Sequence, residues 1–300
     1  MKYIVTGGCG FIGSNLVKRL SRDGNEVIVV DVLSTGAVSN LPGKFTLLKK
    51  ISEIKKAEDA DGIFHLGIPS STPLYRNDRS LVGKAVGEFV EIMEYAKENR
   101  IRVVYASSSS VYNGNKTPYR EDMPILATDF YTEARYAIER LARVYWDFYK
   151  VRSVGLRMFS VYGENEKSKG KYANLVSQII WAKQSGEMFE VYNRGEATRD
   201  FIHVSDVTEA YIKAMNSDLD CEILNIGTGK AYSINQIIQA VGLKDYRYVE
   251  NPLKNYVDKT LADMRKAEKL LGFQAKIDVM EYLKRFASEG AFESEGVVRV

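Results

Sequence analysis

The fold of this chain of 300 residues is decided by residues 6–13, which read Thr6-Gly7-Gly8-Cys9-Gly10-Phe11-Ile12-Gly13. This stretch follows the strand-like run Tyr3 to Thr6 and opens a segment with apolar side chains at three-to-four spacing, which Gly24 ends. The pattern predicts a strand, a glycine-rich turn and a helix in succession. Because glycine has no Cβ atom, such a turn lets backbone amides and the helix N-terminus approach a pyrophosphate closely. Glycine turns also serve packing alone, so the interpretation needs a second residue.

That second residue is Asp31, which follows the predicted strand Val27 to Val30 and lies eighteen residues beyond Gly13. Near this offset a carboxylate accepts hydrogen bonds from the ribose diol of a bound dinucleotide and repels a 2′-phosphate. The sequence therefore predicts NAD, rather than NADP, as the cofactor. In the first part of the chain we expect the cofactor to contact Gly7, Gly10, Phe11, Ile12, Gly13, Asp31 and Leu66.

Strands and helices continue to alternate after this unit, with further strands predicted at Ile63 to Leu66, Val103 to Ala106 and Val154 to Leu156. This rhythm predicts an α/β fold with a doubly wound parallel sheet and helices on both of its faces. After about residue 165 the pattern loosens. We expect residues 1–165 to form an NAD-binding Rossmann domain and residues 166–300 to form mostly a smaller C-terminal α/β substrate lobe. Within the second part, residues from about 200 to 227 are expected to return to the Rossmann sheet.

The second half also contains shorter signals. Ser233 and Gln236 resemble a capping box, and Gly272 is placed to end a helix. We predict helices around Asn174 to Gln184, Ile234 to Val241 and Asp263 to Leu271, and a strand at Glu222 to Ile226.

Composition narrows the class of protein. The 42 basic and 39 acidic residues give a formal charge of +3, with no long block of one sign, which does not favour a nucleic-acid partner. No apolar run approaches the roughly 18 residues of a membrane span. The two cysteines lie far apart and there are only two histidines, so neither a disulfide framework nor a metal site is expected. We predict a cytoplasmic protein without a membrane partner.

Two groups of polar residues are candidates for chemistry. Ser107 to Ser110 follow the strand Val103 to Ala106, at the edge of a parallel sheet where ligands bind. Tyr131 and Arg135 lie one helical turn apart and so share one helix face. A tyrosine, with a reference pKa of about 10, becomes a useful base only near a positive charge, which Arg135 and an oxidised nicotinamide would supply. Taken alone, the serines also fit a solvated loop, and Tyr131 with Arg135 also fits an ordinary surface helix.

Together these motifs resemble the extended short-chain dehydrogenases/reductases of the NAD-dependent epimerase/dehydratase family, and in style its UDP-glucose 4-epimerase-like members. The resemblance covers nearly the whole sequence. It rests on the glycine turn, on the serine run and on three further stretches: Tyr131 to Arg135 with Glu139, Arg157 to Gly163, and Thr198 to Val204.

The resemblance implies a nucleotide-sugar 4-epimerase of the UDP-glucose/UDP-galactose type. Such an enzyme oxidises C4 transiently and returns hydride to the opposite face of the sugar, so that NAD is regenerated in each cycle. Tyr131 would be the acid/base, Ser108 its hydrogen-bonding partner, and Arg135 would occupy the family's lysine position. Asn174 and Arg199 match positions that contact the diphosphate, and a homodimer is expected through the helices that carry Tyr131. The substrate-binding residues implied are Ser108, Ser109, Ser160, Asn174, Tyr192 and Arg199.

Four positions depart from the family pattern. Arginine replaces lysine at Arg135, Lys84 replaces an asparagine near the nicotinamide, and Ser160 replaces a second asparagine. The late arginine of the family is also missing, and Lys254 is the nearest cation. By the family positions that they occupy, we expect the cofactor to contact Lys84, Tyr131 and Arg135. We hypothesise that Lys84 partly replaces the missing lysine.

The reaction itself has alternatives. Dehydratases of the family carry an Asp-Glu pair after the catalytic hydroxyl, because elimination of water needs an extra acid and base. Here those positions are Ser109 and Ser110, which favours epimerisation. A nucleotide-sugar reductase or dehydrogenase, a dehydratase, and a non-catalytic NAD-binding regulatory protein stay open, as do the sugar and the nucleotide base.

Overall fold

The computed structural model describes residues 1–300 except 42, 44, 55–58, 127–128, 252–256 and 290–300. Its centre is a seven-stranded parallel sheet in the order β11-β6-β5-β4-β1-β2-β3. This is the doubly wound order, extended by one strand at one edge, and it confirms the predicted fold class. The strands are β1 (Lys2–Thr6), β2 (Glu26–Val30), β3 (Thr46–Leu48), β4 (Gly62–His65), β5 (Arg102–Ser108), β6 (Ser153–Met158) and β11 (Cys221–Ile226).

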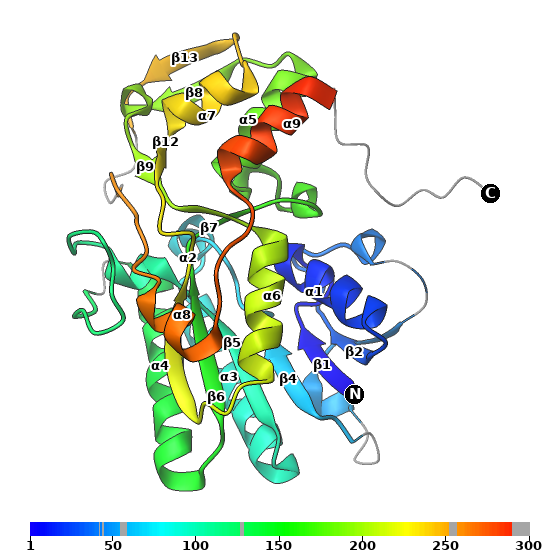
Figure 1. Cartoon of the computed structure of the whole chain (residues 1–300). Coiled ribbons are helices and arrows are strands. Elements are labelled where there is room, and N and C mark those ends of the chain that lie inside the picture. The colour runs from blue at the N-terminus through cyan, green and yellow to red at the C-terminus, as the bar shows by residue number, and fades with distance from the viewer. Residues whose placement is uncertain (42, 44, 55–58, 127–128, 252–256, 290–300) are drawn as a thin grey trace.

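Both faces of the sheet are covered by helices (Figure 1). Successive strand residues point to opposite faces, so Val5 packs under one pair of helices and Ile4 under the other. The first pair is α1 (Phe11–Arg22) and α6 (Val204–Met215), and the second is α3 (Leu81–Asn99) and α4 (Phe130–Tyr149). This double burial is why the strands are almost continuously apolar.

A smaller lobe lies beyond the carboxyl ends of the strands (Figure 1). Its own apolar core is built on α5 (Leu175–Ser185), α7 (Ile234–Val241) and α9 (Val279–Glu289). Side-chain and backbone hydrogen bonds between Ser233 and Gln236 form the predicted capping box of α7. Three two-stranded sheets complete the lobe and its junction, and they pair β7 (Ser160–Tyr162) with β10 (Phe201–His203), β9 (Thr198–Arg199) with β12 (Tyr232–Ser233), and β8 (Phe189–Tyr192) with β13 (Tyr246–Val249).

Short helical segments connect these elements. Two are α-helical, α2 (Thr72–Asn77) and α8 (Arg265–Leu271). The others are 3-10 turns: η1 (Val38–Asn40), η2 (Ile51–Glu53), η3 (Ser109–Tyr112), η4 (Glu166–Tyr172) and η5 (Asn193–Gly195). The predicted strands and helices are confirmed within a few residues, whereas β3 of the central sheet and the short strands of the two-stranded sheets were not predicted. The division into two domains stays a prediction, although β11 pairs with β6 along its whole length.

A buried ion pair joins three elements below the edge of the sheet. Arg157 of β6 donates from Nε and Nη2 to the two carboxylate oxygens of Glu139 on α4, at 2.8 and 2.6 Å. The Ser107 hydroxyl of β5 donates to the same carboxylate at 2.6 Å. Burial opposes the charge on Arg157, but the contact with Glu139 outweighs it and holds the pKa of this guanidinium above its usual value.

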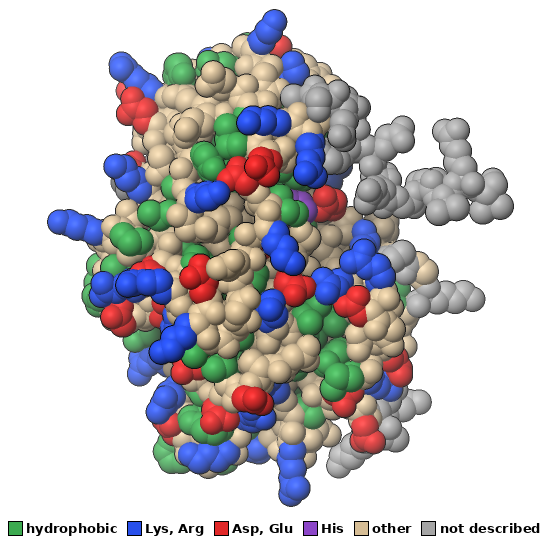
Figure 2. Space-filling view, in the orientation of Figure 1, with side chains coloured by type: hydrophobic (Ala, Val, Ile, Leu, Met, Phe, Trp, Pro, Cys, Tyr) green, Lys and Arg blue, Asp and Glu red, His purple; other side chains and the backbone are tan. Residues whose placement is uncertain are grey.

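The outer surface is mixed in charge. On the face drawn in Figure 2, basic and acidic side chains are interspersed rather than gathered into one block. In the part of the chain that the structure describes, no helix combines the length and the apolar character needed to cross a membrane. The cytoplasmic location stays a prediction.

The Glu139–Arg157 pair makes a prediction for stability. Replacing Glu139 by Gln leaves the Arg157 charge buried without its counter-charge, and loss of one partner of such a pair costs about 3 kcal/mol. We expect Glu139→Gln to lower the free energy of unfolding in urea by about that amount. Glu133→Gln is the control, since Glu133 is exposed on the same helix. Equal effects of the two substitutions would contradict a stabilising role for the pair.

Candidate active site

A cavity of about 490 Å³ lies at the carboxyl ends of β1, β4 and β5, between the sheet and the smaller lobe. Its size suits an organic ligand. The structure brings most of the residues singled out in the sequence to its walls: Gly7, Gly10, Phe11, Ile12, Gly13, Leu66, Ser108, Ser109, Tyr131, Arg135, Ser160, Asn174 and Arg199.

The glycine turn forms the floor of the cavity. A Cβ atom on Gly13 would lie 2.0 Å from the carbonyl oxygen of Gly7, and Gly7 itself has φ +67°, which favours glycine. Helix α1 begins directly after Gly10, and no side chain among the described residues caps it. The first amides of α1 are therefore available to an anion, so the turn fits the pyrophosphate of a dinucleotide.

Asp31 stands at the end of β2 beside this turn. Its two carboxylate oxygens accept hydrogen bonds from the backbone amides of Cys9 and Leu33, at 2.9 and 2.7 Å. These bonds fix the carboxylate next to the glycine turn and leave each oxygen a further lone pair for a ribose hydroxyl. Asp31 is not one of the residues that line the cavity itself.

The backbones leaving β1 and β4 nearly touch at the same edge. A Cβ atom on Gly7 would lie 2.7 Å from the backbone of Gly67. The Thr6 hydroxyl accepts a hydrogen bond from the Gly67 amide at 3.1 Å and lies 2.8 Å from Nδ1 of His65. Burial, assisted by the nearby charge of Arg135, lowers the pKa of His65 to about 3. His65 is thus a neutral structural residue that fixes the Thr6 hydroxyl.

Tyr131 lies in the first turn of α4 and faces the cavity with 8% of its surface exposed. The carboxylate of Asp129 caps this helix by accepting from the Thr132 amide at 2.8 Å, and it also accepts from the Thr72 hydroxyl at 3.3 Å. The ring of Tyr75 packs edge-on against that of Tyr131, with the ring centroids 5.5 Å apart. These contacts hold the phenol at one orientation.

Arg135 is a buried cation one turn below Tyr131. Its guanidinium donates to the backbone carbonyls of Ala106 and Pro69, at 2.9 and 3.1 Å, and its charged carbon lies 5.0 Å from the centre of the Tyr131 ring. Only 3% of the residue is exposed. Arg135 therefore joins the ends of β5 and of the segment after β4, and it places a fixed positive charge beside the phenol.

Neighbouring serines of the run Ser107 to Ser110 make different contacts. Ser107 points into the network with Glu139, whereas Ser108 accepts at its Oγ atom from the amide and the hydroxyl of Ser110, at 3.2 and 2.9 Å. Ser108 and Ser109 are half-buried on the cavity wall. Because each hydroxyl both donates and accepts, this wall suits a polyhydroxylated ligand.

The opposite wall comes from the smaller lobe. Asn174 caps α5 by accepting from the Val176 amide at 3.0 Å, so the N-terminus of this helix faces the cavity. Arg199 donates to the carbonyls of Thr198 and Asp258. The buried carboxylate of its neighbour Asp200 accepts from the amides of three later residues: Thr228, Gly229 and Ala262. Arg199 and the α5 terminus together suit a phosphate.

Besides Asp31, two expected residues, Lys84 and Tyr192, are not among the residues that line the cavity. Lys84 lies in the first turn of α3 with a half-exposed side chain, 3.9 Å from Glu88, and Tyr192 ends β8 away from the lining residues. The hypothesis that Lys84 replaces the family lysine thus gains no support from its position. Lys254 lies outside the described residues.

The structure also adds residues that sequence reasoning missed. Arg76, Asn113 and Lys169 line the cavity, and Lys169 lies 3.2 Å from the buried Glu166. Arg76 and Lys169 are basic residues, but they belong to no sequence motif that indicated a binding site.

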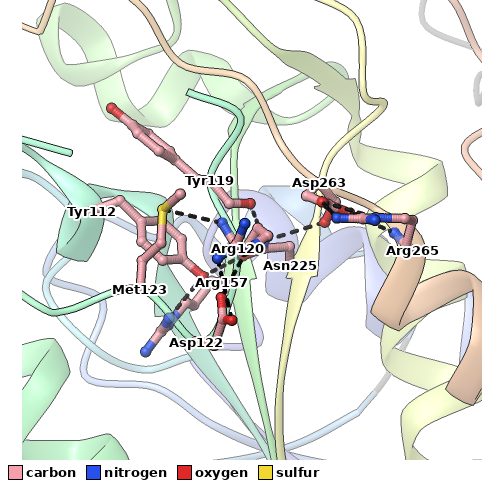
Figure 3. Close-up of polar contacts among 9 residues, drawn as sticks. All are labelled: Tyr112, Tyr119, Arg120, Asp122, Met123, Arg157, Asn225, Asp263 and Arg265. Carbon is pink, nitrogen blue, oxygen red and sulfur yellow. Dashed lines mark hydrogen bonds and ion pairs between the residues drawn. The ribbon is translucent and has the colours of Figure 1, made fainter. Parts of the chain in front are cut away.

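Behind Ser108 and Ser109, the hydrogen bonds of Arg157 continue to β11 at the edge of the seven-stranded sheet. Figure 3 shows Tyr112, Arg157 and Asn225 gathered around one set of polar contacts. Arg157 donates to the Tyr112 hydroxyl at 2.7 Å, and this hydroxyl donates to Asn225 at 2.8 Å. The Asn225 side-chain amide in turn donates to the carbonyl of Tyr119 at 2.9 Å. Glu139 and Arg157 were noted in the sequence, but their contact with Tyr112 and Asn225 was not.

Comparison with known proteins agrees with this geometry. The model of the NAD dependent epimerase/dehydratase family matches residues 3–227. A putative UDP-glucose 4-epimerase of Methanocaldococcus jannaschii is 31% identical over 94% of this chain and 96% of its own. The structure of UDP-glucose 4-epimerase from Thermotoga maritima with UDP-glucose superimposes with a TM-score of 0.89 at 28% identity, covering 96% of this chain and 98% of that one. MoeE5 in complex with UDP-glucose and NAD gives 0.83 at 31% identity, covering 94% and 96%.

The glycine turn makes the second prediction. We expect Gly13→Ala to weaken NAD binding by at least about tenfold, equivalent to about 1.4 kcal/mol, because its methyl group would collide with the Gly7 carbonyl. Isothermal titration calorimetry measures the dissociation constant. Gly87→Ala is the matched control, since a Cβ atom there would meet nothing within 4 Å. An unchanged dissociation constant for Gly13→Ala would refute the assignment of the turn.

Proposed function

The chain belongs to the NAD-dependent epimerase/dehydratase family, and from that premise we propose that it is a nucleotide-sugar 4-epimerase of the UDP-glucose 4-epimerase type. One observation carries the proposal: a tyrosine, Tyr131, and the hydroxyl wall of Ser108 and Ser109 line the same cavity as the glycine turn. A sugar held between them would have its ring hydroxyls beside an acid/base and its carbon atoms beside the cofactor.

The cofactor of this family is NAD, and the cavity has the features that it needs. Gly7, Gly10 and Gly13 leave room for the pyrophosphate at the start of α1, and Asp31 is fixed within the same turn. When bound, NAD supplies reversible oxidation at C4 of the sugar. The protein's own groups must then hold the sugar, move one proton and exclude other reactions.

We assign the proton transfer to Tyr131. As the phenolate, its oxygen would take the proton of the sugar hydroxyl while the carbon is oxidised, and as the phenol it would give that proton back while the carbon is reduced. Arg135 contributes through charge alone, because an arginine holds its proton too tightly to relay it. Its guanidinium is fixed by two carbonyls, and it stabilises negative charge that develops on the phenol without reorganising. Ser108 donates to or accepts from the same sugar hydroxyl.

The nucleotide end of the substrate is assigned to the smaller lobe. Arg199 can offer two parallel donors to a diphosphate, and the N-terminus of α5 after Asn174 adds a favourable dipole. Relatives with UDP-glucose bound support a UDP-hexose. Reaction at C4 then requires that the sugar turn over within the cavity while the nucleotide stays held.

Epimerisation is favoured over dehydration by the side chains beside Ser108. Ser109 and Ser110 offer hydroxyls where an elimination needs an acid and a base. Among the described residues that line the cavity, Asp129 is the sole carboxylate, and it is already used as the cap of α4. A curated relative, UDP-glucuronic acid decarboxylase 1 of Xenopus tropicalis, shows that neighbouring activities differ, so the reaction must be measured.

The third prediction concerns the reaction. We expect the purified protein to interconvert one C4 pair of UDP-sugars without net production of NADH, and Tyr131→Phe to lower kcat by at least about 100-fold, the usual contribution of an acid/base. Chromatography of products from UDP-glucose, UDP-galactose, UDP-N-acetylglucosamine and UDP-glucuronate, with and without added NAD, provides the measurement. Tyr136→Phe, on the same helix but outside the cavity lining, is the control.

Other outcomes identify the alternatives. Stoichiometric consumption of NAD or NADH would indicate a dehydrogenase or reductase, and a product that has lost water would indicate a dehydratase. Binding of NAD without any product from the panel would contradict the epimerase and favour a non-catalytic protein.

We further propose a homodimer that pairs through α4. The outer face of this helix exposes Val144 and Phe148, which are 45% and 76% exposed and lie four residues apart. Leu141 continues the same stripe and is half-buried. Side chains at this spacing share one helix face, so a second copy of the chain can cover them together.

The fourth prediction tests this stripe. Phe148→Glu places a charge on the most exposed side chain of the stripe, and we expect it to shift the protein from dimer to monomer in multi-angle light scattering. Met188→Glu is the control, because Met188 is 59% exposed on the smaller lobe. A wild-type monomer at micromolar concentration, or a Phe148→Glu dimer, would refute the proposal.

A further inference from the structure

The charged side chains around the cavity differ in whether they already have a hydrogen-bonding or ionic partner in the protein. Arg135 donates to two backbone carbonyls, and Lys169 is paired with Glu166. Arg199 lies in the smaller lobe, where it suits the diphosphate. The remaining cation of the described lining is Arg76. No described residue forms a hydrogen bond or ion pair with its side chain, which is exposed at the cavity rim.

Arg76 is held near the reacting end of the cavity. It lies in the short helix α2, one residue after Tyr75, whose ring is fully buried and packs against that of Tyr131. The start of α2 is tied to the start of α4 by the hydrogen bond from Thr72 to Asp129. The backbone that carries Arg76 is therefore positioned by the same contacts that orient the proposed acid/base.

We propose that Arg76 is a specificity residue that binds a carboxylate on the sugar, so that the preferred substrate is a UDP-linked acidic sugar. The proposal rests on the proposed function for the placement of the sugar beside Tyr131. A cation with no intramolecular counter-charge adds nothing to the recognition of a neutral hexose beyond ordinary hydrogen bonds. Its planar fork pairs well with the two oxygens of a carboxylate.

The surrounding groups fit the same ligand. Ser108, Ser109 and Asn113 on the facing wall can donate to carboxylate oxygens that the guanidinium does not occupy. Asp129, the carboxylate of the described lining, would repel an acidic sugar least if its own charge is already bound. Its oxygens accept hydrogen bonds from the Thr132 amide and the Thr72 hydroxyl. The pairing would be partly exposed, because Arg76 itself is exposed, so its contribution is expected to be about tenfold in affinity rather than larger.

The test uses two matched pairs of substrates that differ in a carboxylate. UDP-glucuronate against UDP-glucose tests a carboxylate at C6, and UDP-N-acetylmuramate against UDP-N-acetylglucosamine tests one on an ether substituent. For the full-length protein with NAD, kcat/KM is measured by chromatography and affinity by calorimetry. The variants are Arg76→Gln and the control Arg79→Gln, since Arg79 lies three residues on, over the Phe130 ring, and outside the cavity lining.

We expect the wild-type protein to favour one acidic sugar over its neutral counterpart by about tenfold, and Arg76→Gln to remove that preference while Arg79→Gln retains it. The pair that shows the effect identifies where the carboxylate lies. A wild-type preference for both neutral sugars, or a ratio that Arg76→Gln leaves unchanged, would overturn the inference. If no sugar is interconverted, the proposed function fails, and the ratio of affinities still decides the role of Arg76.

Discussion

The close approach of two backbones, at Gly7 after β1 and Gly67 after β4, is the constraint on which the site depends. A side chain at Gly7 would collide with Gly67, so this edge of the sheet must be built of bare backbone. It is also the point where the strand order reverses, and there the loops on either side diverge and leave a cavity. The Thr6 hydroxyl fixes the Gly67 amide in place, and the neutral His65 ring lies beside that hydroxyl.

A second buried constraint lies behind that edge and gives the serine wall its rigidity. Glu139 accepts three hydrogen bonds, one from Ser107 and two from Arg157, and Arg157 also donates a hydrogen bond to the Tyr112 hydroxyl. Since these residues come from β5, α4, β6 and η3, a displacement of any one element would break at least one of these buried hydrogen bonds. The hydroxyls that face the cavity are therefore placed by polar groups that never touch the ligand.

The sequence predicts the sheet better than the site. Buried parallel strands such as Val103 to Ala106 are apolar throughout and are bounded by glycines or polar residues, so their pattern is visible. Strand β3 was missed because three residues, Thr46 to Leu48, carry no period. The glycine turn was predictable because its chemistry is local. Arg76 was not, because only the packing of Tyr75 on Tyr131 brings its helix to the cavity.

Two arginines show how burial decides what the same side chain does. Arg135 is buried, donates from Nη1 and Nη2 to the carbonyls of Ala106 and Pro69, and holds its charge beside the Tyr131 ring. Arg76 lines the same cavity as Tyr131, but its side chain is exposed. A buried guanidinium fixed by backbone carbonyls acts on its neighbour through charge, whereas an exposed guanidinium is available to pair with an incoming anion. On the proposed assignment, Arg135 supplies a fixed charge beside Tyr131 in place of the family lysine, and Arg76 recognises the charge of the sugar.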